Sequence, residues 1–433
     1  MRIKLQKKTT LEYVLITILI PASFVGYFTF FAWIYFDITF WVRFQFLLPA
    51  ALSLLLLVFA KNLSFHPIAV LAIFIALFST LQGLIFKWLF VDIAADTLRV
   101  VLPFLLFTGV LSFLARKDNT SIYLRSLIKI AIVFQLIILS VSVVYKSLAV
   151  LNGAPIIQYA INPIVIPLLL LCITTMNVLD WGKWRYFLIF LGFATPIFTL
   201  SKTMFIVNFF LLLLLLFFIK KKYSISVIVI FVISIIFLIY NSSFDIDDFS
   251  ILQRFSIFAE TTFQGGDSDG SSGGRMAEAL NAMHQLKTEL PFSLLLGLGS
   301  GAQWFDTLGL LNAIDESLAS GNFRQGGGAH HIHLTYIAIL FRYGLAGLCL
   351  FGLYIYISFR SAWVSYHSYD KKSFEGKLSL ALLFYFFASF IQSLFTYAIY
   401  DSFEYAIFAA VACALAHSRK ASTPRSYSSS RLA

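Results

Sequence analysis

Residues 326–333 read Gly-Gly-Gly-Ala-His-His-Ile-His and close the one long polar stretch of a chain that otherwise consists of apolar runs. This stretch begins near Asn241 and ends at Ile332, so it spans 92 residues. It holds 11 of the 21 acidic residues but only four basic ones. A basic residue in such an acidic segment indicates a specific partner, either a carboxylate or a bound anion. The segment is therefore where we expect a water-facing site.

The composition excludes an ordinary soluble domain. Of 433 residues, 60% are hydrophobic and 12% are charged, and a bilayer core about 30 Å thick needs helices of about 20 apolar residues. The 32 basic residues lie mainly in short loops between apolar runs, a placement that orients membrane proteins and does not predict a nucleic-acid partner. Cys172, Cys349 and Cys413 each lie inside an apolar run. They are typical of small core residues, not of a disulfide framework or a metal site.

The apolar runs predict an all-α, polytopic membrane bundle of about 12 helices. The first run is too long for a signal peptide and lacks a small-residue cleavage site, so we interpret it as the first span. The spans are expected at 11–33, 44–60, 67–86, 98–115, 126–148, 161–179, 186–200, 203–219, 223–240, 333–359, 378–398 and 402–417.

Charge predicts the orientation of these spans. If the N-terminus is cytoplasmic, 22 of the 32 basic residues fall in cytoplasmic segments, as the positive-inside rule requires. Both termini are then expected in the cytoplasm, and the polar loop 241–332 outside it. Residues 418–433, rich in Ser and Arg, predict a disordered tail.

Within the polar loop, the sequence predicts a mobile segment, a helix and a turn. Gly265 to Gly274 is rich in Gly, Ser and Asp, which indicates a mobile segment. A helix from Arg275 to Leu290 is expected to follow, with Ser272 as a cap and Pro291 as its end. A glycine-rich turn at Leu296–Gly301 comes next. The helix is predicted to lie on another surface through apolar residues at three- and four-residue spacing, namely Met276, Leu280, Met283, Leu286 and Leu290.

Two features of the loop have the chemistry to bind phosphate. Arg275 at a helix start combines a guanidinium with the helix dipole, which suits an anion. The alternative is a surface arginine paired with Glu278 or Asp269. The glycines at 297, 299 and 301 could let backbone approach a phosphate, but the strand–helix context and the lysine of a nucleotide loop are missing. A plain turn is the simpler interpretation.

The histidines predict proton transfer. His330, His331 and His333 are three of seven histidines in the chain, and a neutral histidine at the membrane surface can take a proton from a sugar hydroxyl. A structural role is the alternative. His331 and His333 could instead bind a metal, but no Cys or compact carboxylate set completes that site. No metal and no cofactor is predicted.

Several cations lie within or beside apolar runs, where they are costly unless they snorkel or find a partner. Lys202 lies in a very tight hairpin at the membrane surface, between two predicted spans. For Lys202, snorkelling to the interface is the simple interpretation, and the same holds for Arg99. Arg342 lies inside a span, about nine residues after His333, and is the stronger candidate for an internal partner.

Taken together, these motifs resemble those of the bacterial O-antigen polymerases of the Wzy type and the O-antigen ligases. Ser201-Lys202-Thr203 is similar to the family's Ser-Arg-small pair, with Lys in place of Arg. Gly274-Arg275, Pro291 and the glycine-rich turn resemble its Gly-Arg, Pro and Gly-x-Gly run. His333-Leu334-Thr335-Tyr336-Ile337, with Gly344 beyond, resembles its histidine motif, although Leu334 replaces a polar residue. The resemblance covers roughly 188–353.

The resemblance implies four regions: membrane helices over 1–187, a polymerase/ligase-like module over 188–353, further helices over 354–417 and the tail 418–433. It also implies a metal-independent glycosyltransferase of the bacterial inner (plasma) membrane. Its partners would be an oligosaccharide on undecaprenyl diphosphate as substrate, membrane lipid and a chain-length regulator. His333 and Arg275 would be catalytic. The substrate-binding residues would be Lys202, Arg254, His330, His331 and Arg342.

Three functions compete. The His-x-Thr-Tyr sequence at 333–336 favours a polymerase of O-antigen or a related surface polysaccharide such as capsule. The first alternative is an O-antigen ligase that transfers polymer to the lipid A core. The second is a lipid-linked sugar transporter or flippase. Transporters usually carry midplane charges and broken helices in related halves, whereas this chain has no clear internal repeat and its charges gather at one surface.

Overall fold

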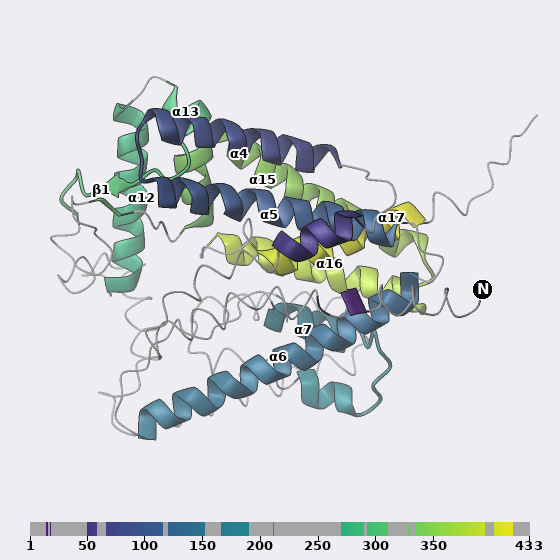
Figure 1. Cartoon of the computed structure of the whole chain (residues 1–433). Helices are drawn as coiled ribbons and strands as arrows, with labels where there is room; N and C mark the ends of the chain where they lie inside the picture. Colours follow the sequence, from purple (N-terminus) through teal and green to yellow (C-terminus); the bar gives the residue numbers. More distant parts are fainter. Residues whose placement is uncertain are drawn as a thin grey trace, which may run out of the picture.

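The protein is described by a computed structural model whose described residues are 14–15, 18, 50–58, 66–115, 120–151, 166–189, 211, 270–289, 292–310, 328–329, 332, 334–394 and 402–418. Helices dominate this part of the chain (Figure 1). The long helices are α4 (Pro67–Ile85), α5 (Phe90–Leu114), α6 (Thr120–Leu151), α15 (Thr335–Ser368), α16 (Phe374–Ser393) and α17 (Phe403–Ser418). The shorter elements are α7 (Ile166–Thr175), α12 (Gly270–Thr288), α13 (Ser293–Leu296), β1 (Trp304–Phe305) and β2 (Gly328–Ala329).

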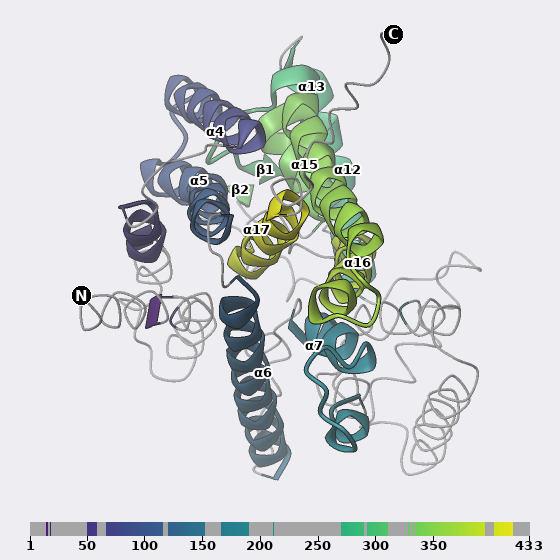
Figure 2. The same ribbon diagram turned by 90° about the vertical axis from the view of Figure 1, so that its right-hand side faces the viewer.

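The long helices pack side by side as a bundle. Helix α15 contacts α4, α16 and α17, while α5 contacts α4 and α17, and Figure 2 shows this group from one end, with its helices slanted to the view. Among the described residues, 4 helices are long and apolar enough to cross a membrane: α4, α5, α15 and α16. They overlap the spans predicted at 67–86, 98–115, 333–359 and 378–398. The total of about 12 spans stays a prediction, because several of them fall outside the described residues.

Helix α17 forms the centre of the bundle. It is buried from Ser402 to Leu415, as expected for a helix that is apolar on every side. Its alanines let neighbouring helices approach closely, and its aromatic rings pack against theirs. The Tyr405 ring lies 5.2 Å from that of Tyr354 in α15, and the Phe408 ring lies 5.9 Å from that of Tyr385 in α16, both between centroids.

Among the four apolar helices, α5 and α15 differ most from the predicted spans. Helix α5 begins at Phe90 rather than at 98, because Asp92 and Asp96 lower the local hydropathy although both side chains are buried. Helix α15 continues to Ser368 rather than ending at 359. Its last turns carry Arg360 and His367, so the helix extends beyond its apolar part.

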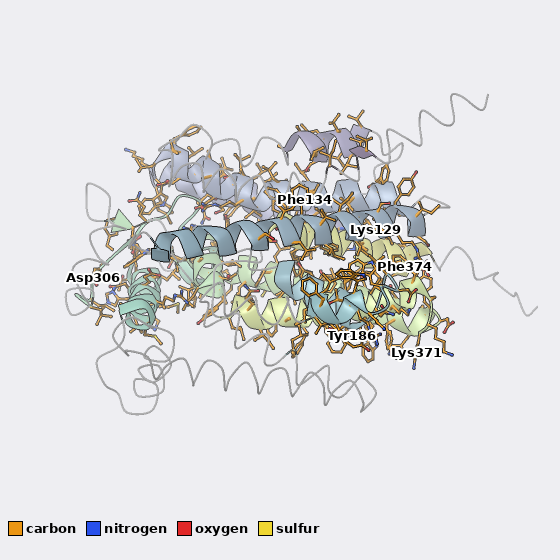
Figure 3. All side chains as sticks on the ribbon, turned by 90° about the horizontal axis from the view of Figure 1, so that it is seen from below. Lys129, Phe134, Tyr186, Asp306, Lys371 and Phe374 are labelled. Carbon is orange, nitrogen blue, oxygen red and sulfur yellow. The ribbon has the colours of Figure 1, made fainter. Side chains whose placement is uncertain are left out.

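Several short connections meet at one end of the bundle. Lys377 forms an ion pair with Asp180 at 2.7 Å, and the Arg125 guanidinium lies 4.2 Å from the centre of the Phe374 ring. Ser121 also donates a hydrogen bond to Glu375. Figure 3 shows Lys371 and Phe374 at this end and Asp306 at the opposite end. Lys371 and Lys377 thus belong to one end of the bundle, and Asp306 lies at the other.

Candidate active site

The elements of the polar loop gather at the end of the bundle that holds Asp306. Helix α12 runs across the axes of the long helices there, with α13 and β1 beside it (Figure 1). We call α12, α13, the turn 297–301, β1 and β2 the cap. A separate hydrophobic cluster holds it together, in which Ala282 and Leu286 of α12 share a core with Trp304, Ile332 and Phe341. The cap is thus packed onto the first turns of α15.

Helix α12 differs from its prediction at the start and on its apolar face. It begins at Gly270, so Ser272 is not its cap, residues 270–274 are helical, and Arg275 lies in the second turn rather than at the N-terminus. The prediction failed because apolar spacing, which placed the start at Arg275, carries no information about a Gly/Ser segment. Met276 and Leu280, predicted to be packed, are 59% and 47% exposed. Leu286 is buried as predicted.

Buried amide side chains on α12 hold the segment around β1. The Asn281 amide donates to Asp306 Oδ1 at 2.8 Å and its carbonyl oxygen accepts from Leu308 N–H at 2.9 Å. Gln285 donates to the Gln303 carbonyl at 3.1 Å and accepts from Phe305 N–H at 3.2 Å. The sequence reasoning missed these residues, although the i, i+4 spacing of the two amides was a usable signal.

The segment that leads to the histidines is anchored on both sides. Strand β2 pairs antiparallel with β1, with Ala329 opposite Trp304. Ile332 is fully buried in the cap cluster, and Leu334 is the N-cap residue of α15. His333 therefore lies in the chain between two residues with fixed surroundings. His330, His331 and His333 themselves lie outside the described residues, as do Lys202 and Arg254.

The glycine-rich turn packs against backbone. Leu298 N–H donates to the Phe341 carbonyl at 2.8 Å, and Gly299 N–H to the Arg342 carbonyl at 3.1 Å. Gly297 has φ +78°, and a Cβ at this position would collide with the Arg342 carbonyl group. On α15, Gly344 interrupts the helix with φ +64° and ψ −165° and lies against Leu295 of α13. This agrees with the interpretation of a plain turn and explains why glycine is needed.

Beneath the turn, Arg342 has the internal partner that the sequence indicated. Its Nε lies 2.7 Å from Asp96 Oδ2, and both side chains are fully buried. Asp96 also accepts from Gly301 N–H at 2.8 Å, while Arg99, on its other side, lies 3.5 Å from Asp96 Oδ1. Sequence reasoning did not single out Asp96. An ionisable residue at the start of an apolar run, four positions after another, was the signal that could have found it.

Of the predicted site residues, the structure describes Arg275 and Arg342. Arg275 is partly exposed on α12, and α12 packs in one cluster with Ile332, the residue before His333. Arg342 lies below them, bound to Asp96. In the described part of the chain, no three His, Cys, Asp or Glu side chains gather as a metal site would require. The arrangement offers a guanidinium at the surface of a well-packed cap, at the end of the apolar helices.

Comparison with known proteins adds a family. Residues 187–352 match the model of a family described as O-antigen ligase. No curated protein matches the chain. Enzymes of this family are of the glycosyltransferase type, ligases or polymerases, and their substrates are lipid-linked oligosaccharides in the membrane. The match and the apolar helices together show that this is a membrane-embedded protein that resembles the O-antigen ligases and Wzy-type polymerases.

Proposed function

We propose that the protein is a glycosyltransferase that polymerises oligosaccharide repeat units linked to undecaprenyl diphosphate, on the outer face of the bacterial inner membrane. The observation that carries the proposal is the cap cluster. In it, apolar residues of α12, the helix that carries Arg275, share a packed core with Ile332, the residue before His333 in the chain. The family match covers both residues. Reaction at this place suits a substrate whose lipid stays in the bilayer while its sugars lie in water.

The chemistry follows from the side chains. An acceptor hydroxyl oxygen bonds to the anomeric carbon of the donor, and the bond from that carbon to the diphosphate oxygen breaks. His333 takes the hydroxyl proton as general base. The electron pair leaves with undecaprenyl diphosphate, whose growing charge Arg275 stabilises through charge-assisted hydrogen bonds. Lys202 and Arg254 are proposed to bind the same diphosphate, and His330 and His331 the sugars.

The proposed orientation rests on charge. Lys371, Lys372 and Lys377 assign their end of the bundle to the cytoplasm by the positive-inside rule. Figure 3 shows Lys371 at the opposite end from Asp306, which directly follows β1 of the cap. Both termini are then cytoplasmic, and the cap faces the periplasm or cell exterior. A ligase that transfers finished polymer to the lipid A core is the second candidate, because the matching family is described as O-antigen ligase.

The surface glycans of a strain that lacks the gene distinguish these functions. A polymerase deletion leaves lipid A core with a single repeat unit and no ladder. A ligase deletion leaves bare core, with long polymer still on undecaprenyl diphosphate. Single repeats trapped on the cytoplasmic side would indicate a flippase. An unchanged lipopolysaccharide profile would exclude O-antigen and direct the same assay to capsule.

Complementation of that strain tests the two catalytic residues. Arg275→Ala and His333→Ala are expected to reach the membrane in normal amounts and to restore no polymer. Lys287→Ala is the matched control for Arg275, because Lys287 is an exposed cation on the same helix, and it is expected to restore the full ladder. Normal product from both catalytic variants would overturn the assignment of the site.

A further inference from the structure

Asp96 is a buried carboxylate that joins three elements. On α5 it is fully buried, and its Oδ2 lies 2.7 Å from Arg342 Nε of α15. The same oxygen accepts from Gly301 N–H of the cap turn at 2.8 Å. Its backbone carbonyl accepts from the Tyr343 hydroxyl at 3.1 Å. One residue of α5 therefore holds two consecutive side chains of α15 and the end of the glycine-rich turn.

Helix α4 completes the same connection. Ser79 donates its hydroxyl to the Arg342 carbonyl at 3.2 Å, and its own carbonyl accepts from Ser300 N–H at 3.0 Å. Trp88, between α4 and α5, donates to the Leu298 carbonyl at 3.0 Å. The cap turn and the first part of α15 are thus attached to α4 and α5 by hydrogen bonds and by one ion pair.

Because α15 is broken at Gly344, this attachment decides how the first part of the helix is oriented. Gly344 is non-helical, so residues 335–343 form a short helical segment whose direction the longer segment after the break does not set. Arg342 and Tyr343 are the last side chains of this short segment, and His333 lies just before its first residue. Whatever fixes Arg342 and Tyr343 also fixes the direction of this short segment, which begins two residues after His333 in the sequence.

We propose that Asp96 is a positioning residue for the transfer reaction: through Arg342, Tyr343 and Gly301 it sets the orientation of residues 335–343, the helical segment that follows His333 and Leu334 in the chain. This inference rests on the proposed function. It assigns Arg342 to Asp96 instead of to substrate. A buried ion pair is a weak source of net stability, since apolar residues of similar volume often replace it without loss, but it can specify one arrangement among several.

The test uses the purified full-length protein with a lipid-linked oligosaccharide donor. Asp96→Asn keeps the volume and removes the negative charge that faces Arg342. We expect kcat to fall by about 10²-fold, the effect of a misplacement of about 1 Å, with the donor KM within about twofold of the parent, because the diphosphate contacts remain. Asp92→Asn is the matched control. Asp92 is also buried, one turn earlier on α5, and accepts from Gln303 at 3.2 Å, so its kcat should stay close to that of the parent.

A second readout is independent of activity. Leu334→Cys places a thiol at the N-cap of α15, and Lys287→Cys places one on the exposed face of α12. In the Asp96→Asn background, the rate of maleimide labelling should rise several-fold at 334 and stay unchanged at 287. A kcat loss without faster labelling at 334, faster labelling without a kcat loss, or a change in KM alone would each overturn the positioning role.

Folding failure is covered by a further variant. If Asp96→Asn does not fold, the double variant Asp96→Leu with Arg342→Met removes both charges together. A folded double variant with the same kcat loss supports the proposal, and one with the kcat of the parent overturns it. If neither variant folds, Asp96 is required for folding alone and the proposal fails. An inactive parent protein would instead refute the proposed function, and the labelling at 334 would still report on Asp96.

Discussion

Two ion pairs of equal length show how burial decides the energetic weight of a charge. Arg342–Asp96 and Lys377–Asp180 both measure 2.7 Å, but the first is fully buried, whereas the two side chains of the second are 24% and 66% exposed. Removal of one partner from a buried pair leaves a desolvated charge, at a cost of about 3–5 kcal/mol. An exposed pair contributes about 0–1 kcal/mol because water and salt screen it.

We therefore expect Asp96→Ala to lower the free energy of unfolding by about 3–5 kcal/mol and Asp180→Ala to change it by less than about 1 kcal/mol. Denaturant unfolding in detergent, followed by tryptophan fluorescence, measures both. Equal losses in the two variants would show that burial does not govern these pairs.

His66 predicts a dependence of stability on pH. Burial lowers the pKa of His66 below its ordinary value, and the charge of His417 lowers it further. Neutral Nδ1 accepts from Ile68 N–H at 3.3 Å and caps α4, a role that a protonated nitrogen cannot fill. As pH falls, the unfolded chain takes up a proton at about pH 6.5 and the folded protein only below that, so stability is lost across this window.

The melting temperature should accordingly fall more between pH 7.5 and pH 5.5 in the parent than in His66→Asn, because asparagine keeps a capping oxygen and does not titrate. The difference between the two pH profiles isolates His66 from other titrating groups. Parallel profiles would contradict the account.

Among the elements, α15 depends most on a single backbone conformation. Gly344 has φ +64° and ψ −165°, a region that is nearly restricted to glycine and costs other residues about 1–3 kcal/mol. A Cβ at this position would also meet the Leu295 carbonyl group. Gly352 lies in the regular part of the same helix, where a Cβ would have nothing within 4 Å.

Gly344→Ala is therefore expected to destabilise the protein by more than about 2 kcal/mol. It is also expected to reduce activity, because α13 and the cap turn pack directly against Gly344. Gly352→Ala should be neutral or stabilising by up to about 1 kcal/mol, because alanine favours a helix interior. Thermal unfolding of the two variants makes the comparison. A neutral Gly344→Ala would mean that the break in α15 is not required.

The lengths of the apolar runs predicted which helices exist, but they predicted the ends of those helices poorly. Helix α4 was expected at 67–86 and is found at Pro67–Ile85, since its apolar residues coincide with its helical ones. Helix α5 begins earlier than predicted and includes Asp92 and Asp96. Both carboxylates can be buried there because they accept hydrogen bonds from residues more than 200 positions away in the sequence. Such pairings depend on tertiary packing, so no local pattern could have predicted them.

At the scale of the whole molecule, the opposite ends of the bundle should lie on opposite sides of the membrane. Lys287, on the cap, and Lys371, between α15 and α16, are both exposed. A membrane-impermeant maleimide should label Lys287→Cys in intact cells, with the outer membrane opened where one is present, and Lys371→Cys only after the inner membrane is permeabilised. The reverse pattern would place the cap in the cytoplasm and exclude a substrate on the outer face.

Part of the candidate site could be predicted from the order of its motifs along the chain. The order of Lys202, Arg275, the glycine-rich turn and His333 indicated the family, and the match at 187–352 supports that resemblance. The internal partner of Arg342 was expected, but its identity was not. The sequence did not show that α12 would turn Ala282 inward and leave Met276 exposed. Both faces of this helix carry apolar residues, and the packing of the cap decides which face is buried.

The most direct test of the account is glycosyl transfer by the purified protein. Wild type and Arg275→Ala, reconstituted in lipid nanodiscs, would receive an oligosaccharide repeat unit on undecaprenyl diphosphate, and mass spectrometry would follow both products. We predict that the wild type releases undecaprenyl diphosphate in step with donor molecules that carry two or more repeats, and that folded Arg275→Ala does neither. A folded wild-type protein that consumes no donor, or an Arg275→Ala variant that works as fast as the wild type, would contradict a transfer site in the cap.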